Sequence, residues 1–213
     1  MKIDAVVMRH PTPGAPLHLT DHIDSIVINA GDGTHEHPTQ AILDMTSLHE
    51  KFGYLKGLKV GIIGDIAHSR VALSNIHGLK TMGAEVTLCG PSTLIPPFAE
   101  ELGVSVNYNV DEVIEWADAL NVLRIQRERM GGGLLPSVRE YRNLFGITTD
   151  RLSMHKKEIV IMHPGPMNRG VEIDSSVADS DQAIILDQVL NGVASRMAIL
   201  YLLLGGKQEE GDS

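Results

Sequence analysis

The residues of this chain best suited to chemistry are arginines and histidines that stand directly after apolar, β-branched runs. They occur in five segments, which are RHP (9–11), AGDGTHEHPTQ (30–40), DIAHSR (65–70), RIQRER (124–129) and HPGPMNRG (163–170). An arginine presents planar, forked N–H donors that match the oxygens of carboxylates and phosphates. Helices that begin after HPTQ and AHSR would add backbone N–H groups and the positive end of a helix dipole. The five segments therefore predict a pocket for a small ligand that carries several negative charges.

An alternation of strand-like and helix-like segments explains how these residues would come together. Amphipathic stretches such as 38–53 and 69–83 separate seven apolar runs, at residues 3–8, 25–29, 59–64, 85–90, 105–109, 119–123 and 158–162. In the first stretch Pro38 suits the first helical position and Gly53 the end of the helix. This pattern is typical of an α/β fold with a parallel sheet covered by helices on both faces. Such sheets bind ligands beyond the carboxyl ends of their strands, which is where the basic segments lie.

Any one of these basic residues could instead cap a helix or pair with a surface acid. That explanation is weak for five segments on one sheet edge, in a chain whose formal net charge is -9. The same net charge argues against general binding to nucleic acids or to anionic membranes, because their phosphates would be repelled. We therefore expect a local basic pocket on an acidic protein.

The composition is that of a globular protein, with 43% hydrophobic and 21% charged residues. No secretory signal is visible, and the longest apolar run near the C-terminus, residues 197–204, is too short to span a bilayer. The single cysteine, Cys89, excludes an internal disulfide and fits a reducing compartment. We therefore expect a cytoplasmic protein in which Cys89 is a buried, inert thiol.

Two other kinds of site deserve comparison with the anionic pocket. The run GIIGDIAHSR contains Gly61 and Gly64 but not the G-x-G-x-x-G spacing, and the next strand ends without an acidic residue, which argues against NAD. His35 and His37 beside Asp32 could suggest a metal, but a third ligand at a recognisable spacing is missing. Neither alternative is favoured.

The basic segments resemble, in content and in order, those of the aspartate transcarbamoylase family's catalytic chain. The matching pieces are MRHP, NAGDGTHEHPTQ, GDIAHSR, LRIQRER and MHPGPMNRG, and the resemblance extends from about Ile3 to Leu204. The related ornithine transcarbamoylases have a cysteine where this chain has Thr39, and a cysteine-containing motif where it has HPGP (163–166). The resemblance is therefore to the aspartate-specific branch.

This resemblance implies transfer of the carbamoyl group of carbamoyl phosphate to L-aspartate, in pyrimidine synthesis, with no metal or organic cofactor. It implies that Arg9 and His37 contact the carbonyl oxygen and stabilise the oxyanion, Arg9 also contacting the phosphate. The implied ligands of the carbamoyl NH₂ are Gln40 and the backbone carbonyls of Pro164 and Gly165. The implied ligands of the aspartate carboxylates are Arg70, Arg124 and Gln126. The segment ERMGGGLLPS (128–137) corresponds to a loop that closes over aspartate.

The resemblance also suggests a division of the chain. Residues 1–38 would belong to the carbamoyl-phosphate-binding domain, residues 39–186 to the aspartate-binding domain, and residues 187–204 to a C-terminal helix that returns to the first domain; residues 205–213 would be a disordered tail. In the family, a Ser-Thr-Arg-Thr-Arg phosphate loop and a Ser- and Lys-bearing loop precede DAVVMRHP, and neither has a counterpart among the 213 residues. We therefore expect a partial carbamoyl-phosphate domain, and a chain that alone is weakly active or inactive.

The expected partners are the two small substrates and further copies of the chain, since the family forms a homotrimer with shared sites. A dihydroorotase and a regulatory chain are further candidates, whereas nucleic acid and membrane are not. A different possibility is a non-catalytic binder of an acidic amino acid or of a partner that keeps the aspartate-side pocket. Arg9, His37 and Gln40 argue against it, because a binder of aspartate alone has no use for residues on the carbamoyl side.

Overall fold

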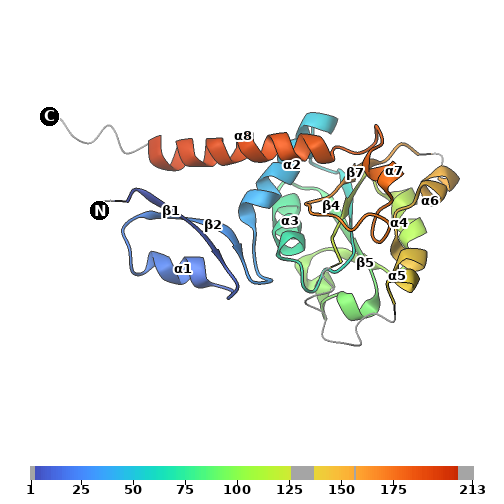
Figure 1. Ribbon diagram of the computed structural model, residues 1–213, viewed down its shortest axis with the longest axis horizontal. Helices are drawn as coiled ribbons and strands as arrows, with labels where there is room; N and C mark the ends of the chain where they lie inside the picture. Colours follow the sequence, from blue (N-terminus) through green and yellow to red (C-terminus); the bar gives the residue numbers. More distant parts are fainter. Residues whose placement is uncertain (1–2, 126–136, 156, 206–213) are drawn as a thin grey trace.

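The computed structural model describes residues 3–125, 137–155 and 157–205. Strands and helices alternate along these ranges (Figure 1). Their order is β1 (Ala5–His10), α1 (Ala15–Thr20), β2 (Ile26–Asp32), α2 (Pro38–Phe52), β3 (Lys59–Ile63), α3 (Arg70–Thr81), β4 (Glu85–Cys89), β5 (Ser105–Asn107), α4 (Val110–Trp116), β6 (Ala119–Val122), α5 (Val138–Phe145), α6 (Thr149–Met154), β7 (Val160–Met162), α7 (Ser175–Ala178) and α8 (Ile185–Leu204). Two short 3₁₀ helices, Ser92–Leu94 and Ala99–Leu102, lie between β4 and β5.

All seven predicted strands are present, and they form two sheets. One sheet has the order β1-β2 and the other the order β5-β4-β3-β6-β7. Every pairing between these strands is parallel, which confirms the predicted α/β class. Helix α2 begins at Pro38 and ends before Gly53, whose φ of 78° closes the helix in the left-handed region, as the sequence predicts.

The five-stranded sheet has a packed core on each face, because alternate residues of a strand point to opposite faces. On one face Val60 and Ile62 of β3 pack with Leu48 of α2 and Ile76 of α3. On the other face Ile63 of β3 belongs to a core that includes residues of α4 and α5, among them Val113, Ile114, Tyr141 and Phe145. The prediction of helices on both faces is therefore confirmed.

Cys89, at the end of β4, is completely buried in the second of these cores. Burial raises the pKa of its thiol to about 12, so the thiolate that would react as a nucleophile does not form near neutral pH. The prediction of a buried cysteine is confirmed.

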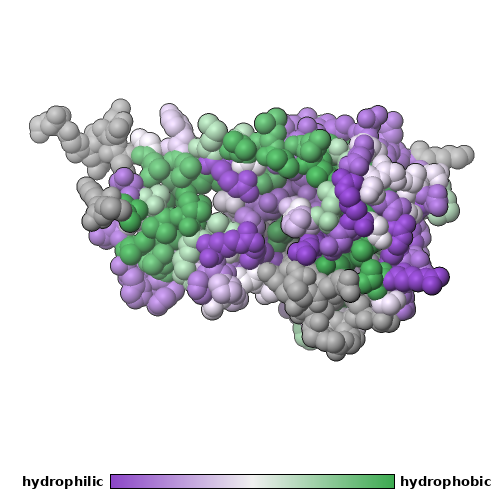
Figure 2. Space-filling view, viewed as in Figure 1, coloured by the Kyte–Doolittle hydropathy of each residue, from purple (hydrophilic) through white to green (hydrophobic). Residues whose placement is uncertain are grey.

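Helix α8 joins the two parts of the fold. It begins beside the five-stranded sheet, packs along α2, and ends on the side of the molecule where β1 lies (Figure 1). Apolar side chains are exposed along it, and Figure 2 shows apolar residues gathered along α8 and over the β1–β2 unit. They include Leu186, Val189, Leu190, Val193, Met197 and Leu202. Among the helices described, none is both long and apolar enough to cross a membrane.

Candidate active site

A cavity of about 340 Å³ lies between the two sheets, and most of the predicted site residues line it. They are Arg9, His37, Gln40, Arg70, Arg124, Pro164 and Gly165. Gln126, the remaining predicted residue, and residues 128–136 of the predicted closing loop lie outside the described residues. The structure thus brings together residues spread over 157 positions of sequence, from Arg9 to Gly165, while their roles toward a ligand stay predictions.

The carboxyl ends of the strands supply these residues. Arg9 is the next-to-last residue of β1, and His37 follows β2 at the N-cap of α2. Arg70 is the first residue of α3, after β3. Arg124 follows β6, and Pro164 follows β7. The location beyond the strand ends is the one expected for ligand sites in parallel α/β sheets.

The N-terminal ends of two helices meet this cavity. Gln40 on the first turn of α2 lines it, as do Ser69 and Arg70 at the start of α3. The hydroxyl of Ser69 caps α3 by accepting a hydrogen bond from the backbone N–H of Ala72 at 3.2 Å. Both helices are long enough for their dipoles to favour a negative charge at these ends.

His37 is electrically neutral at neutral pH in this setting. Burial lowers the pKa of its imidazole from 6.5 to about 4, and the positive charges of Arg70, Arg9 and Arg196 add to this effect. A neutral imidazole has one N–H donor and one acceptor nitrogen, and Nδ1 lies 3.4 Å from the hydroxyl oxygen of Thr39. The ring can therefore donate a hydrogen bond to an oxygen in the cavity without carrying a charge.

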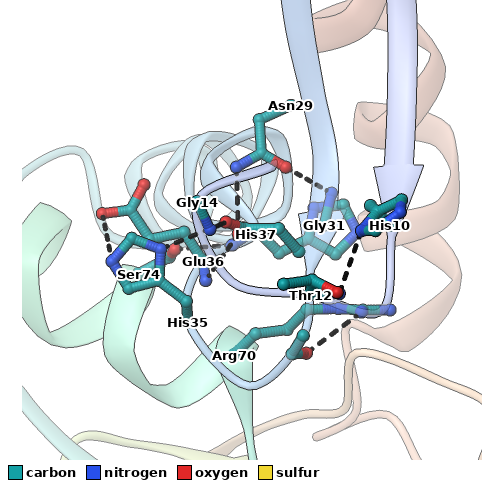
Figure 3. Close-up of polar contacts among 12 residues, drawn as sticks. His10, Thr12, Gly14, Asn29, Gly31, His35, Glu36, His37, Arg70 and Ser74 are labelled. Carbon is teal, nitrogen blue, oxygen red and sulfur yellow. Dashed lines mark hydrogen bonds and ion pairs between the residues drawn. The ribbon is translucent and has the colours of Figure 1, made fainter. Parts of the chain in front are cut away.

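The loop that ends in His37 is fixed by the buried carboxylate of Asp32. The carboxylate accepts hydrogen bonds from the backbone N–H groups of Gly14 at 2.7 Å and Glu36 at 3.0 Å, and from the Asn29 amide at 3.1 Å. Burial alone would raise the pKa of Asp32, but these bonds and that of His35 outweigh it and lower the pKa. The backbone N–H of His37 in turn donates to the hydroxyl of Ser74 on α3 at 2.8 Å (Figure 3).

This network also bears on the possibility of a metal near His35 and His37. The Nδ1 atom of His35 lies 3.2 Å from Asp32, whose carboxylate is already occupied by the loop. Within the described ranges, no group of three or more histidine, cysteine, aspartate or glutamate side chains is arranged to hold a metal ion.

Arg70 crosses the end of β2 to reach the cavity. Its Nη1 donates to the carbonyl oxygen of Gly33 at 3.2 Å (Figure 3). The side chain passes directly over Gly31, where a Cβ atom would lie 2.7 Å from the Nε of Arg70. Gly31 has a φ of 112°, so both its conformation and its lack of a side chain allow this approach.

The segment after β7 is held by backbone contacts with two buried side chains. The backbone N–H of His163 donates to Oε1 of Gln188 on α8 at 2.9 Å. The imidazole of His163 is fully buried, and its Nδ1 accepts the N–H of Gly165 at 2.9 Å. These contacts fix the peptide units whose carbonyls were predicted to bind a carbamoyl NH₂.

Arg196 lines the cavity and was not predicted from the sequence. It lies on α8, where its Nη1 donates to the carbonyl oxygen of Gly192 at 2.8 Å. The only sequence signal is an arginine that interrupts an apolar helix, since it follows none of the strands. The packing of α8 along α2 carries it to the site.

Comparison with known proteins agrees with this geometry. Residues 1–50 match the model of the aspartate/ornithine carbamoyltransferase carbamoyl-P binding domain, and residues 56–203 match that of the Asp/Orn binding domain. The chain is 59% identical over 213 residues to the aspartate carbamoyltransferase catalytic subunit of Gemmatimonas aurantiaca, covering 100% of this chain and 67% of that protein. It is 62% identical over 203 residues to that of Christiangramia forsetii, covering 95% and 66%.

The chain thus spans about two thirds of the length of these curated relatives. Its fold is similar to the crystal structure of aspartate transcarbamoylase from Trypanosoma cruzi in complex with carbamoyl phosphate, with a TM-score of 0.84 and 30% identity, over 93% of this chain and 65% of that one. The two domain models of this family match residues 1–50 and 56–203, and arginines from both sheets line one cavity between them. The chain belongs to the aspartate/ornithine carbamoyltransferase family.

Proposed function

We propose that this chain catalyses, or supplies most of the site for, the reaction of carbamoyl phosphate with L-aspartate to give N-carbamoyl-L-aspartate and phosphate. The observation that carries the proposal is one cavity lined by a neutral histidine, His37, and by arginines from both sheets' strand ends and from α8. Both substrates are small and carry anionic groups, a phosphate in one and two carboxylates in the other, which this set of donors suits. The identity with aspartate carbamoyltransferase catalytic subunits supports aspartate rather than ornithine as the acceptor.

The proposed chemistry follows from the residue types. The amine nitrogen of aspartate attacks the carbonyl carbon of carbamoyl phosphate, and the carbonyl oxygen becomes negatively charged. Arg9 and the N–H of His37 stabilise that charge by hydrogen bonds that strengthen as it develops. The bond to phosphate then breaks, and phosphate leaves with the amine proton.

The other residues position the two reactants. Gln40 and the carbonyls of Pro164 and Gly165 accept hydrogen bonds from the carbamoyl NH₂. Arg70 and Arg124, together with Gln126, bind the carboxylates of aspartate and hold the amine in line with the carbonyl carbon. In this proposal residues 1–38 belong to the carbamoyl-phosphate-binding domain, residues 39–186 to the aspartate-binding domain and residues 187–204 to a helix that returns to the first domain, so Gln40, Pro164 and Gly165 reach carbamoyl phosphate from the second domain.

We propose that the working form is a cytoplasmic homotrimer with sites shared between subunits. The exposed apolar side chains along α8 and on β1, such as Leu190 and Val7, support association. Light scattering of the purified chain tests this, and a monomer at micromolar concentration would contradict it. A regulatory chain and a dihydroorotase are candidate partners. Co-purification of each of them with this chain tests the interaction.

The test of the function is formation of carbamoyl-aspartate by the purified chain, compared with an Arg124→Ala variant. The bisubstrate compound N-(phosphonacetyl)-L-aspartate, which the Trypanosoma cruzi enzyme binds, is the matching ligand for calorimetry. Loss of charge-assisted hydrogen bonds worth about 1.5–3 kcal/mol each should weaken its binding to Arg124→Ala by about 10- to 150-fold.

The competing proposal, a binder of an acidic amino acid alone, predicts a different pattern. L-Aspartate and N-(phosphonacetyl)-L-aspartate would then bind equally well. An Arg9→Ala change would leave the affinity for N-(phosphonacetyl)-L-aspartate unaltered. Product formation or a strong dependence on Arg9 decides for the carbamoyltransferase; the opposite pattern decides for the binder.

A further inference from the structure

One carboxylate below the cavity, that of Asp44 on α2, is buried among side-chain amides. The exposed fraction of Asp44 is 1%. Its Oδ1 accepts hydrogen bonds from Nε2 of Gln40 at 3.0 Å and Nε2 of Gln188 at 2.7 Å. Its Oδ2 accepts from Nδ2 of Asn75 at 2.8 Å and Nδ2 of Asn121 at 3.4 Å. The four amides come from α2, α8, α3 and β6, so one carboxylate joins four elements.

The chemistry of these groups fixes the direction in which each amide points. An ionised carboxylate only accepts hydrogen bonds, whereas an amide has a donor end and an acceptor end. Burial raises the pKa of Asp44, and the four amides that donate to it oppose this effect. All the hydrogen bonds on its two oxygens are donated to it, as an ionised carboxylate requires. Each amide must therefore turn its NH₂ toward Asp44 and its oxygen away.

For Gln40 this direction reaches the cavity that it lines. With Nε2 held by Asp44, the amide turns Oε1, an acceptor, away from that carboxylate, and Gln40 lines the same cavity as Pro164 and Gly165. If the amide were rotated, its NH₂ group would face the cavity instead. A ligand NH₂ would then meet a second donor and would find no acceptor there.

Gln188 extends the effect of Asp44 to the segment after β7. Its Nε2 is held by Asp44, so its Oε1 is left to accept the backbone N–H of His163 at 2.9 Å. That bond restrains the chain immediately before Pro164 and Gly165, whose carbonyl oxygens are further acceptors. Asp44 thereby orients the Gln40 acceptor directly, and it restrains the carbonyls of Pro164 and Gly165 through Gln188.

We propose that Asp44 is a positioning residue that makes this end of the cavity accept hydrogen bonds only, and so selects a ligand that carries an NH₂ beside its carbonyl over one that carries a methyl group. The inference rests on the proposed function, because it deepens the recognition of the carbamoyl group. A purely structural role, in which Asp44 only ties four elements together, is the alternative that the experiment must separate.

The test uses two stable phosphonates that differ only in the group concerned. Phosphonoacetamide carries the NH₂, and acetonylphosphonate carries a methyl group in its place. Calorimetry on the unaltered chain should show preference for the amide of about tenfold or more, since the methyl compound lacks the two N–H donors that this end of the cavity accepts. In Asp44→Asn, whose side chain can turn a donor toward Gln40, we expect that preference to fall about tenfold while affinity for acetonylphosphonate stays within about threefold.

Ser47→Ala is the matched control. Ser47 is buried on the same face of α2, where its hydroxyl accepts a hydrogen bond from Asn191 of α8 at 3.0 Å, and it does not line the cavity. This variant should lower the unfolding temperature and keep the preference for the amide. Equal loss of affinity for both phosphonates in Asp44→Asn, or an unchanged preference, would overturn the inference and leave the proposed function standing.

Failure of the unaltered chain to bind either phosphonate would overturn the proposed function, and the inference with it. A measurement that needs no variant covers the case in which Asp44→Asn does not fold. In the ¹⁵N-labelled unaltered chain, the side-chain amide protons of Gln40 should exchange slowly with solvent, because they are donated to a buried carboxylate. Exchange at the rate of an exposed glutamine would contradict the proposed orientation.

Discussion

Replacement of Gly31 by alanine should damage the site as well as the fold. A Cβ atom at this position would lie 2.7 Å from Nε and 2.9 Å from Cζ of Arg70. These distances are too short for real contacts, so the guanidinium group must move. The side chain of Arg70 is flexible, and its displacement is therefore cheap for the fold, but it breaks the bond from Nη1 to the carbonyl of Gly33.

The magnitudes follow from these two effects. An alanine forced to the φ of 112° that Gly31 has costs about 1–3 kcal/mol of unfolding free energy. Moving Arg70 would remove the charge-assisted hydrogen bonds that we propose it makes to a carboxylate of aspartate, worth about 1.5–3 kcal/mol each. Affinity for N-(phosphonacetyl)-L-aspartate should therefore fall about 10- to 150-fold, in the range expected for Arg70→Ala itself.

Gly53→Ala provides the control for backbone strain. Gly53 also has a positive φ, 78°, but a Cβ there would meet nothing within 4 Å. The variant should lose about 1–2 kcal/mol of stability and bind the ligand normally. Urea unfolding and calorimetry on both variants give the two numbers. If Gly31→Ala binds the ligand as tightly as Gly53→Ala does, the contact between Gly31 and Arg70 does not position that arginine.

Three further predictions concern charge, pH and packing. Arg196→Gln should weaken binding of N-(phosphonacetyl)-L-aspartate by about 5- to 10-fold, since an exposed cation is partly screened; unchanged calorimetry would remove Arg196 from the site. The ring protons of His37 should titrate by NMR near pH 4 rather than 6.5, and Arg196→Gln should move that pKa upward; titration near 6.5 in the unaltered chain contradicts the neutral histidine. Because the unfolded chain binds this proton at higher pH than the folded one, His37 should make the fold less stable as pH falls from 6.5 to 4, by at most about 3 kcal/mol. Leu88→Ala, in a fully buried position on β4, should cost about 2–5 kcal/mol in urea unfolding, and a cost below 1 kcal/mol would show that the core relaxes around it.

The strands and the residues that follow them could be predicted because their signals are local. An apolar β-branched run such as KVGII identifies β3 without reference to any other segment, and β3 is found at Lys59–Ile63. In a parallel sheet all carboxyl ends share one edge, so Arg70 and Arg124 could be placed together before any contact was known. The division into two sheets has no such local signal, since it depends on which strands pair.

Arg196 and Asp44 show what local patterns cannot supply. Arg196 reaches the cavity only because α8 packs back along α2, which brings together residues 144 positions apart in the sequence, such as Asp44 and Gln188. Asp44 reads as an ordinary polar position on an amphipathic helix until Gln188 and Asn121 are brought against it. Both depend on long-range packing, which the periodicity of a single helix does not encode.

The charge distribution gives these two long-range residues a common consequence. The chain carries a formal net charge of -9, yet Arg9, Arg70, Arg124 and Arg196 line one cavity in which His37 is kept neutral. A protonated histidine there would repel the arginines, whereas a neutral one adds a donor without that repulsion. In our proposal the buried carboxylate of Asp44, which accepts from Gln40 and Gln188, orients acceptors for the same cavity. Donors for an oxygen and oriented acceptors for an NH₂ are the two kinds of partner that a carbamoyl group requires. Helix α8 carries Arg196, a donor that lines the cavity, and Gln188, which holds the chain before Pro164 in place.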